Sequence, residues 1–140
     1  MTDTIRLHQP GLRKLLGDLE ASIMEVVWDR DPGARLTVRD VYEALLAQRK
    51  IAYTSVMTVM SNLAKKGVLA VEKEGTAYLY RAPRSREQFT RDAVGAIVSE
   101  LLTDFTDPAL AHFSKAIEGA GIPPEKLANL RSRVEAEDEA

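Results

Sequence analysis

The sequence contains no cysteine, and this absence excludes several kinds of chemistry. A chain without thiols has no disulfide framework, no thiolate metal site and no cysteine nucleophile. Its 2 histidines, His8 and His112, lie far apart along the chain. The nucleophile-elbow, phosphate-loop and zinc-protease motifs are missing as well. We therefore predict that the protein is not an enzyme and holds no metal and no small-molecule cofactor.

Long apolar runs are also missing. The longest stretches, such as residues 93–98, fall far short of the roughly 18 residues that a membrane-spanning helix needs. The first six residues lack the basic and then apolar segments of a secretion signal. With 45% apolar and 29% charged residues the composition is that of a globular protein. We expect a soluble protein of the cytoplasm.

Carboxylates are absent from one long segment. Residues 44–71 hold four basic residues and no aspartate or glutamate. The net charge of −2 is also divided unevenly, because residues 1–82 carry 12 basic against 10 acidic residues and residues 83–140 carry 7 against 11. A surface without carboxylates can approach phosphate without repulsion. Composition alone leaves a chance gap as an equal explanation, so periodicity has to decide.

The spacing of apolar residues predicts three helices in the first half. The first is capped by Gly17 and ended by residues 29–33, and residues 37–40 form a capping box that opens the second. The third begins near Tyr53 and stops at Gly67. The period then changes, because residues 68–73 and 76–81 have the β-branched and aromatic content of two strands, with a tight turn at residues 74–75.

The second half is predicted to be helical. A capping box at residues 85–88 opens a long helix that reaches about Phe105, and two shorter helices follow. The expected fold is mainly α with a small β-hairpin, in the order of a winged helix. The predicted organisation is an N-terminal arm (1–15), a winged helix-turn-helix domain (16–82) and a helical dimerisation region (83–140).

The third helix has two chemically different faces. Its apolar side chains fall in one narrow sector, and the opposite side carries hydroxyls, an amide, a methionine and lysines. An ordinary solvated helix face would carry acids and bases in i,i+4 pairs. A face of small hydroxylated residues suits the major groove, where threonine reads base edges and lysine reaches phosphates. The alternative is a helix packed between two layers.

These considerations give the candidate DNA-binding residues. They are Thr54, Ser55, Met57, Thr58, Ser61, Asn62, Lys65 and Lys66 on this helix, Lys73 at the hairpin tip and Arg39 on the preceding helix.

The long helix of the second half has an apolar surface that covers well over half of its circumference. One partner cannot bury so wide a surface, so we expect this helix to pack against its own chain and against a second chain. The expected dimerisation residues are Phe89, Ile97, Leu101, Phe105, Leu110, Phe113, Ile117, Leu127 and Leu130.

Several segments carry motifs that are specific in combination. They are Leu16-Gly17-Asp18-Leu19-Glu20, Ile23-Met24, Val27-Trp28, Thr37-Val38-Arg39-Asp40-Val41, Ala52-Tyr53-Thr54-Ser55-Val56-Met57-Thr58-Val59, Leu63-Ala64-Lys65-Lys66-Gly67 and Tyr78-Leu79-Tyr80. With these motifs the chain resembles the penicillinase repressor family, of the BlaI/MecI type among the BlaI/MecI/CopY transcriptional regulators. The resemblance runs from about residue 16 to residue 134. The copper-responsive CopY branch ends in a cysteine metal hook, which this chain cannot form.

The resemblance implies a homodimeric repressor that binds an inverted-repeat operator in double-stranded DNA and silences a β-lactamase or related operon. It also implies a membrane sensor-protease as a partner. In the family, cleavage before a phenylalanine in the C-terminal half releases the repressor, and the corresponding bond here joins His112 to Phe113.

Two other functions remain open from the residues alone. One is a ligand-responsive winged helix of the MarR kind, which stabilisation by a small aromatic acid would favour. The other is a winged helix used only for protein–protein interaction, which would form no specific complex with genomic DNA fragments.

Overall fold

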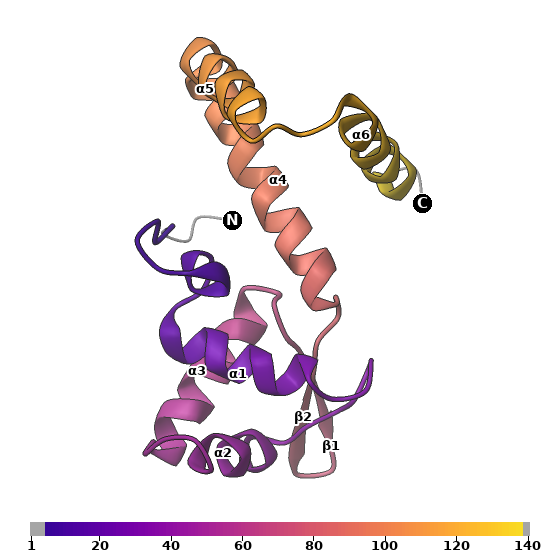
Figure 1. The fold of residues 1–140 in the computed structure, drawn as a ribbon. Coiled ribbons are helices and arrows are strands. Elements are labelled where there is room, and N and C mark those ends of the chain that lie inside the picture. Colours follow the sequence, from indigo (N-terminus) through magenta and orange to yellow (C-terminus); the bar gives the residue numbers. More distant parts are fainter. Residues whose placement is uncertain (1–4, 139–140) are drawn as a thin grey trace. The chain divides into compact units, whose positions relative to one another are not determined.

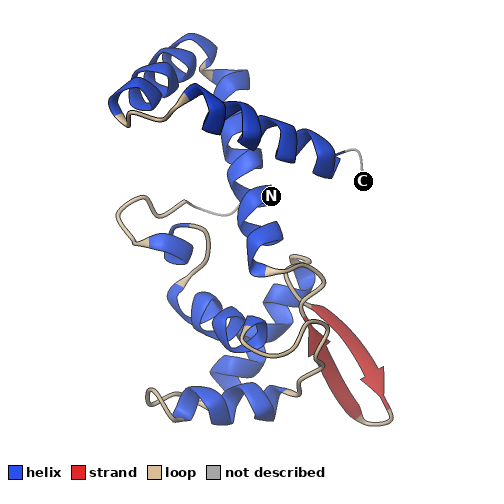
Figure 2. Ribbon diagram, turned by 45° about the vertical axis from the view of Figure 1, so that its right-hand side comes forward, coloured by secondary structure: helices blue, strands red, loops and turns tan. Residues whose placement is uncertain are grey.

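The computed structural model describes residues 5–138 and contains two compact units, the first ending at Ala96 and the second beginning at Ile97. The elements are a 3-10 helix η1 (Gly11–Lys14), α1 (Asp18–Trp28), α2 (Val38–Leu46), α3 (Tyr53–Lys65), β1 (Ala70–Glu74), β2 (Ala77–Arg81), α4 (Arg86–Asp104), α5 (Thr106–Gly119) and α6 (Pro124–Asp138). The expected fold class, mainly α with one small hairpin, is confirmed (Figures 1 and 2). Within residues 5–138, no helix is both long enough and apolar enough to cross a lipid bilayer.

The helix starts follow from side chains that satisfy the first backbone N–H groups. The Gly17 N–H donates to Glu20 Oε1 at 2.8 Å before α1. At α2 the Asp40 N–H donates to Thr37 Oγ1 at 3.1 Å, while the Thr37 N–H donates to Asp40 Oδ2 at 2.9 Å. The same reciprocal pair forms between Ser85 and Gln88 at the start of α4. These three helix starts were predictable from the sequence.

The first unit is built around a single core to which α1, α2 and α3 each contribute one apolar stripe. Its largest fully buried side chains are Leu16, Ile23, Met24, Leu36, Leu45, Met60, Leu63, Leu69, Val41 and Val56. Burying such a side chain stabilises the fold by about 1.5–3 kcal/mol. The three-helix arrangement therefore follows from the need to hide these stripes from water.

The hairpin differs from the prediction in its bounds and in its turn. Val68 and Leu69 lie outside β1, because both donate their N–H groups to the carbonyl of Leu63 and their side chains are buried in the core. The register pairs Glu74 with Ala77, so the turn is at residues 75–76 and not at 74–75. Gly75 has φ +64° and stands first in the turn, where a type II′ hairpin needs a glycine.

The start of α4 belongs to the first unit. Phe89 is 3% exposed, and its ring centroid lies 5.5 Å from that of Trp28 at the end of α1. Trp28 Nε1 also donates to the backbone carbonyl of Arg84 at 3.0 Å. The compact unit therefore extends beyond residue 82, where the sequence placed the end of the winged-helix domain.

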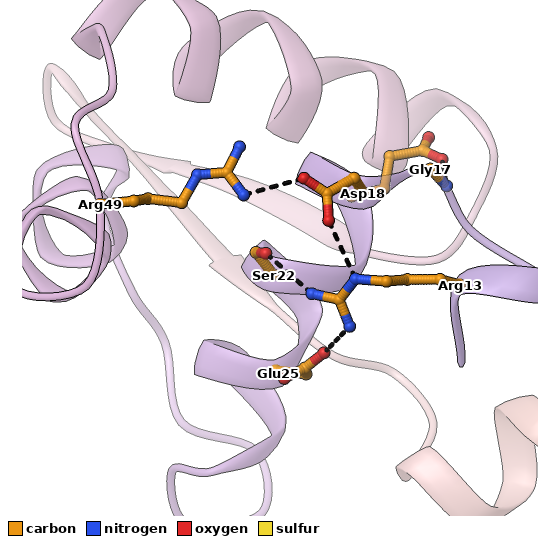
Figure 3. Close-up of polar contacts among 7 residues, drawn as sticks. Arg13, Gly17, Asp18, Ser22, Glu25 and Arg49 are labelled. Carbon is orange, nitrogen blue, oxygen red and sulfur yellow. Dashed lines mark hydrogen bonds and ion pairs between the residues drawn. The ribbon is translucent and has the colours of Figure 1, made fainter. Parts of the chain in front are cut away.

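One arginine fastens the segment before α1 to that helix. Arg13 donates to Asp18 at 2.9 Å, to Glu25 at 2.9 Å and to Ser22 at 3.2 Å (Figure 3). The second oxygen of Asp18 accepts from Arg49, just after α2, at 2.9 Å. The hydrogen bonds from Arg13 and then from Arg49 hold the pKa of Asp18 below its ordinary value. Asp18 is thus a junction between the N-terminal segment, α1 and the chain that leads into α3.

The second unit has no core of its own in the single chain. None of the side chains described between residues 97 and 136 is buried. The exposed large apolar residues of this unit are Leu101, Phe105, Leu110, Phe113, Ile117, Leu127, Leu130 and Val134.

The junction at Asp18 predicts a defined dependence of stability on pH. Because the pKa of Asp18 is lowered by folding, its contribution is complete above the unfolded pKa and is lost as the pH falls through the folded one. Asp18→Asn should therefore lower the unfolding free energy at pH 7, by no more than about 1 kcal/mol because the pair is exposed. The difference from the parent should vanish in acid. Urea unfolding between neutral and acidic pH measures it, with Glu100→Gln as a charge-matched control, and a difference that persists unchanged in acid would contradict the assignment.

Candidate nucleic-acid interface

Helix α3 has one buried face and one solvent-exposed face, as its sequence pattern predicts; the exposed one is called the bare face below. Val56, Met60 and Leu63 are 0% exposed, and Val59 packs partly against the same core. The opposite side is open to solvent. Its exposed residues are Thr54, Ser55, Met57, Thr58, Asn62, Lys65 and Lys66, and Ser61 is half-buried at the edge. The structure thus brings all eight candidate residues of α3 and its C-terminal end onto one side of the helix.

The bare face carries no acidic group of its own, but one carboxylate from α1 reaches its C-terminal end. Lys66 Nζ lies 2.8 Å from Glu20 on α1. Lys65, by contrast, makes no ion pair with any residue between 5 and 138. Lys65 is therefore the lysine of this face whose charge remains available to an anion.

A groove runs between α3 and the hairpin. It has a volume of about 490 Å³. Met57, Ser61 and Lys65 line it from the helix, and Val71 and Tyr78 line it from the strands. Met57 is 44% exposed and Tyr78 is 55% exposed. The exposed methionine is thus part of an apolar wall beside the hydroxyls of α3.

Val71 and Tyr78 line this groove, although the sequence pattern did not place them among the candidate residues. The register pairs Val71 with Tyr80 and Lys73 with Tyr78. Since side chains alternate along a strand, these four residues share one side of the hairpin. The alternation was readable in the sequence, but only the structure shows that this side meets α3.

The hairpin has a second side of opposite character. Glu72 and Glu74 face away from the groove and bind Arg35, at 3.5 and 3.0 Å. Arg81 also lies 3.6 Å from Glu72. Lys73, on the groove side, sits 5.7 Å above the ring of Tyr78. The acids of the hairpin are therefore neutralised on the far side, and the groove side keeps a cation and an aromatic ring.

Arg39 lies at the start of α2 beside the first turn of α3. Its guanidinium is 5.6 Å from the ring of Tyr53 and 3.8 Å from the carboxylate of Glu43.

Burial raises the pKa of the Tyr80 phenol, and the neighbouring Tyr78 and Tyr53 add to the shift. Tyr80, which is 7% exposed, therefore keeps its proton and packs as a neutral side chain.

The residues predicted for dimerisation differ in their exposure. Phe89 is buried in its own chain against Trp28, so it leaves no surface for a second chain. Ile97 is half-buried. The other seven remain at least 36% exposed, namely Leu101, Phe105, Leu110, Phe113, Ile117, Leu127 and Leu130. His112 and Phe113, on either side of the predicted cleavage bond, are exposed on α5.

The part of the chain that the structure describes contains no candidate metal-binding site. No three histidine, cysteine, aspartate or glutamate side chains gather there in a way that could hold an ion. What the site offers is hydrogen-bonding hydroxyls, an apolar wall and a free lysine along one helix.

Comparisons with known proteins identify the family of this chain. A model of the penicillinase repressor family matches residues 16–136. The transcriptional regulator BlaI, from two strains of Mycobacterium tuberculosis, is 36% identical over 103 residues, which cover 73% of this chain and 73% of that protein. The solution structure of the DNA binding domain of the repressor BlaI is 21% identical with a TM-score of 0.46, covering 61% of this chain and 90% of that one.

Two methionines of α3 allow a test of its two faces. Met60→Ala should lower the unfolding free energy by about 2–5 kcal/mol, because it opens a cavity in the core. Met57→Ala should cost less than about 1 kcal/mol, because its side chain lies outside the buried core. Denaturant unfolding of both variants without DNA measures the difference. Equal losses would mean that the outer face is a packing surface and not a free one.

Proposed function

This chain belongs to the penicillinase repressor family of transcriptional regulators, which are not enzymes, and on that premise we propose that it represses transcription by binding an inverted-repeat operator as a homodimer. The observation that carries the proposal is the outer face of α3. This face combines exposed hydroxyls with a lysine that has no carboxylate partner among the described residues. Such a face suits contact with base edges and phosphates of a major groove.

Each part of the interface has a role in this proposal. Thr54, Ser55 and Thr58 read base edges, and Met57 contacts a thymine methyl group. Lys65, Lys73 and Arg39 bind phosphates and set the position of the duplex. Lys66 first has to leave or share its contact with Glu20. Ser61 and Asn62 complete the outer face of α3.

The proposed homodimer rests on the uncovered apolar side chains of the second unit. A soluble monomer rarely leaves so many large apolar residues in water. A second copy of the chain could cover Leu101, Phe105 and Leu110 together with the residues of α5 and α6. Dimerisation would also give the protein the two-fold symmetry of an inverted repeat, whose half-sites lie about 34 Å apart.

The target and the release step extend the proposal. The family's name, penicillinase repressor, supports a penicillinase or related operon as the target. We propose further, from the resemblance to this family, that cleavage of the repressor by a membrane sensor-protease is the inducing event. The proposed bond joins His112 to Phe113, in the middle of α5. Cleavage there would remove α6 and half of α5, and with them Ile117, Leu127 and Leu130 from the dimer surface. The first unit would keep its core, since that core ends at Phe89 and Ala93.

The base-reading role of α3 can be separated from phosphate binding by two substitutions. The operator is first identified as the DNA that the protein retains from its own genome. Thr58→Ala should then weaken operator binding by about 1–3 kcal/mol and leave random DNA nearly unaffected. Lys65→Ala should weaken both and reduce the salt-dependence slope by about one unit. Thr103→Ala, an exposed threonine outside the interface, is the control. Unchanged operator affinity in both test variants would mean that α3 does not read the DNA.

A shortened chain tests the dimer and the release step together. A chain ending at His112 should dissociate at concentrations at which the full chain is dimeric. It should also bind the operator far more weakly, because the two DNA-binding units that contact the two half-sites are no longer linked. A chain ending at Ala136, which keeps every apolar residue named above, should behave as the full chain does. Sedimentation and operator titration measure both properties. If the shorter chain dimerises and binds normally, cleavage at this bond cannot inactivate the protein.

A further inference from the structure

A surface cavity of about 390 Å³ lies on the first unit, away from α3. Its walls come from two segments that are far apart in the sequence, residues 27–34 at and after the end of α1 and residues 81–88 at the start of α4. Small-molecule sites in proteins have volumes of about 300–1,000 Å³. The cavity is therefore large enough for a small ligand.

Basic side chains dominate the charged groups of this cavity. Arg30, Arg81, Arg84 and Arg86 line it, and Asp31 is the one acid among its described lining residues. Two of the arginines already have partners, because Arg84 lies 2.8 Å from Asp92 and Arg81 lies 3.6 Å from Glu72. Arg30 and Arg86 form no ion pair with any residue in the described part of the chain. Two guanidinium groups are thus free to bind an anion.

Part of the lining of the cavity is apolar, and Val27, Trp28, Ala34 and Pro83 contribute to it. The ring of Trp28 is fixed by its contact with Phe89 and by its hydrogen bond to the carbonyl of Arg84. A fixed aromatic wall next to unpaired guanidinium groups matches a ligand that has an apolar body and an acidic group.

We propose that this cavity binds a small organic anion, with its carboxylate or phosphate group on Arg30 and Arg86 and its apolar body against Trp28. Guanidinium groups bind both kinds of acid in a bidentate manner, so the shared chemistry is that of a planar or tetrahedral oxyanion. A bound anion would join the loop after α1 to the segment that enters α4. The site is separate from the outer face of α3, and its existence does not depend on the proposed operator binding.

The chain carries its own reporter for this site, because Trp28 is its only tryptophan. The full-length protein is titrated with benzoate and with phenyl phosphate while the tryptophan emission is followed, and calorimetry provides a second measurement. At least one of the two probes should give a saturable response, and the tighter one identifies the acidic group. Benzyl alcohol, which has the apolar body without the charge, and inorganic phosphate, which has the charge without the body, should bind much more weakly.

Substitutions assign the response to the cavity. Arg30→Gln and Arg86→Gln should each weaken binding of the better probe by about tenfold or more, because each removes a charge-assisted contact. Arg133→Gln removes the same charge from α6 and should leave the affinity unchanged. Both cavity arginines are exposed, and circular dichroism checks that the variants keep their helices.

Three results would overturn the proposal. The first is the absence of saturation by either probe in the millimolar range. The second is equal binding of benzyl alcohol, or an equal loss of affinity in Arg133→Gln. The third is a loss of operator affinity in Arg30→Gln and Arg86→Gln without any response to the probes, which would assign these arginines to the DNA backbone.

Discussion

The burial of one side of α3 is the constraint on which the rest of this structure depends. Val56, Met60 and Leu63 are removed from water by α1 and α2, and a helix cannot rotate about its axis without exposing such residues. The threonines and serine on the other side are therefore held outward by the core and not by any contact of their own. The position of the hairpin follows from the same burial, because Val68 and Leu69 lead the chain out of α3 through the core.

Local signals made much of this fold predictable from the sequence. Thr37 and Asp40 mark the start of α2 because the capping box is complete within four residues, and Gly67 marks the end of α3 because its φ of +80° suits glycine. Contacts between distant residues were not predictable in this way. Lys66 was assigned to phosphate, yet its partner Glu20 lies 46 residues away. Phe89 was assigned to a dimer because its apolar character is visible in the sequence. Its contact with Trp28, 61 residues away, is not visible there.

The two units treat apolar residues in opposite ways. In the first unit the stripes of three helices meet and exclude water, so the unit is complete as a single chain. The second unit has stripes of similar composition on α5 and α6 that meet no covering layer in one chain. The division also separates the two proposed tasks, DNA binding and dimerisation. The residues proposed to contact DNA all precede Ala82. The exposed apolar residues proposed to hold two chains together all follow Ala96. Within the first unit, Trp28 fixes the first turn of α4 to the end of α1.

The alternation of side chains in the hairpin limits how this segment can change during evolution. Lys73 and Tyr78 point to the groove, while Glu72 and Glu74 point to Arg35 on the other side. Inserting or deleting a single residue within β1 would exchange the two sides of that strand. Glutamates would then line the groove and Arg35 would lose both partners. Length variation in this hairpin should therefore be tolerated at the turn, or in steps of two residues along the strands, and single-residue changes within β1 should be selected against.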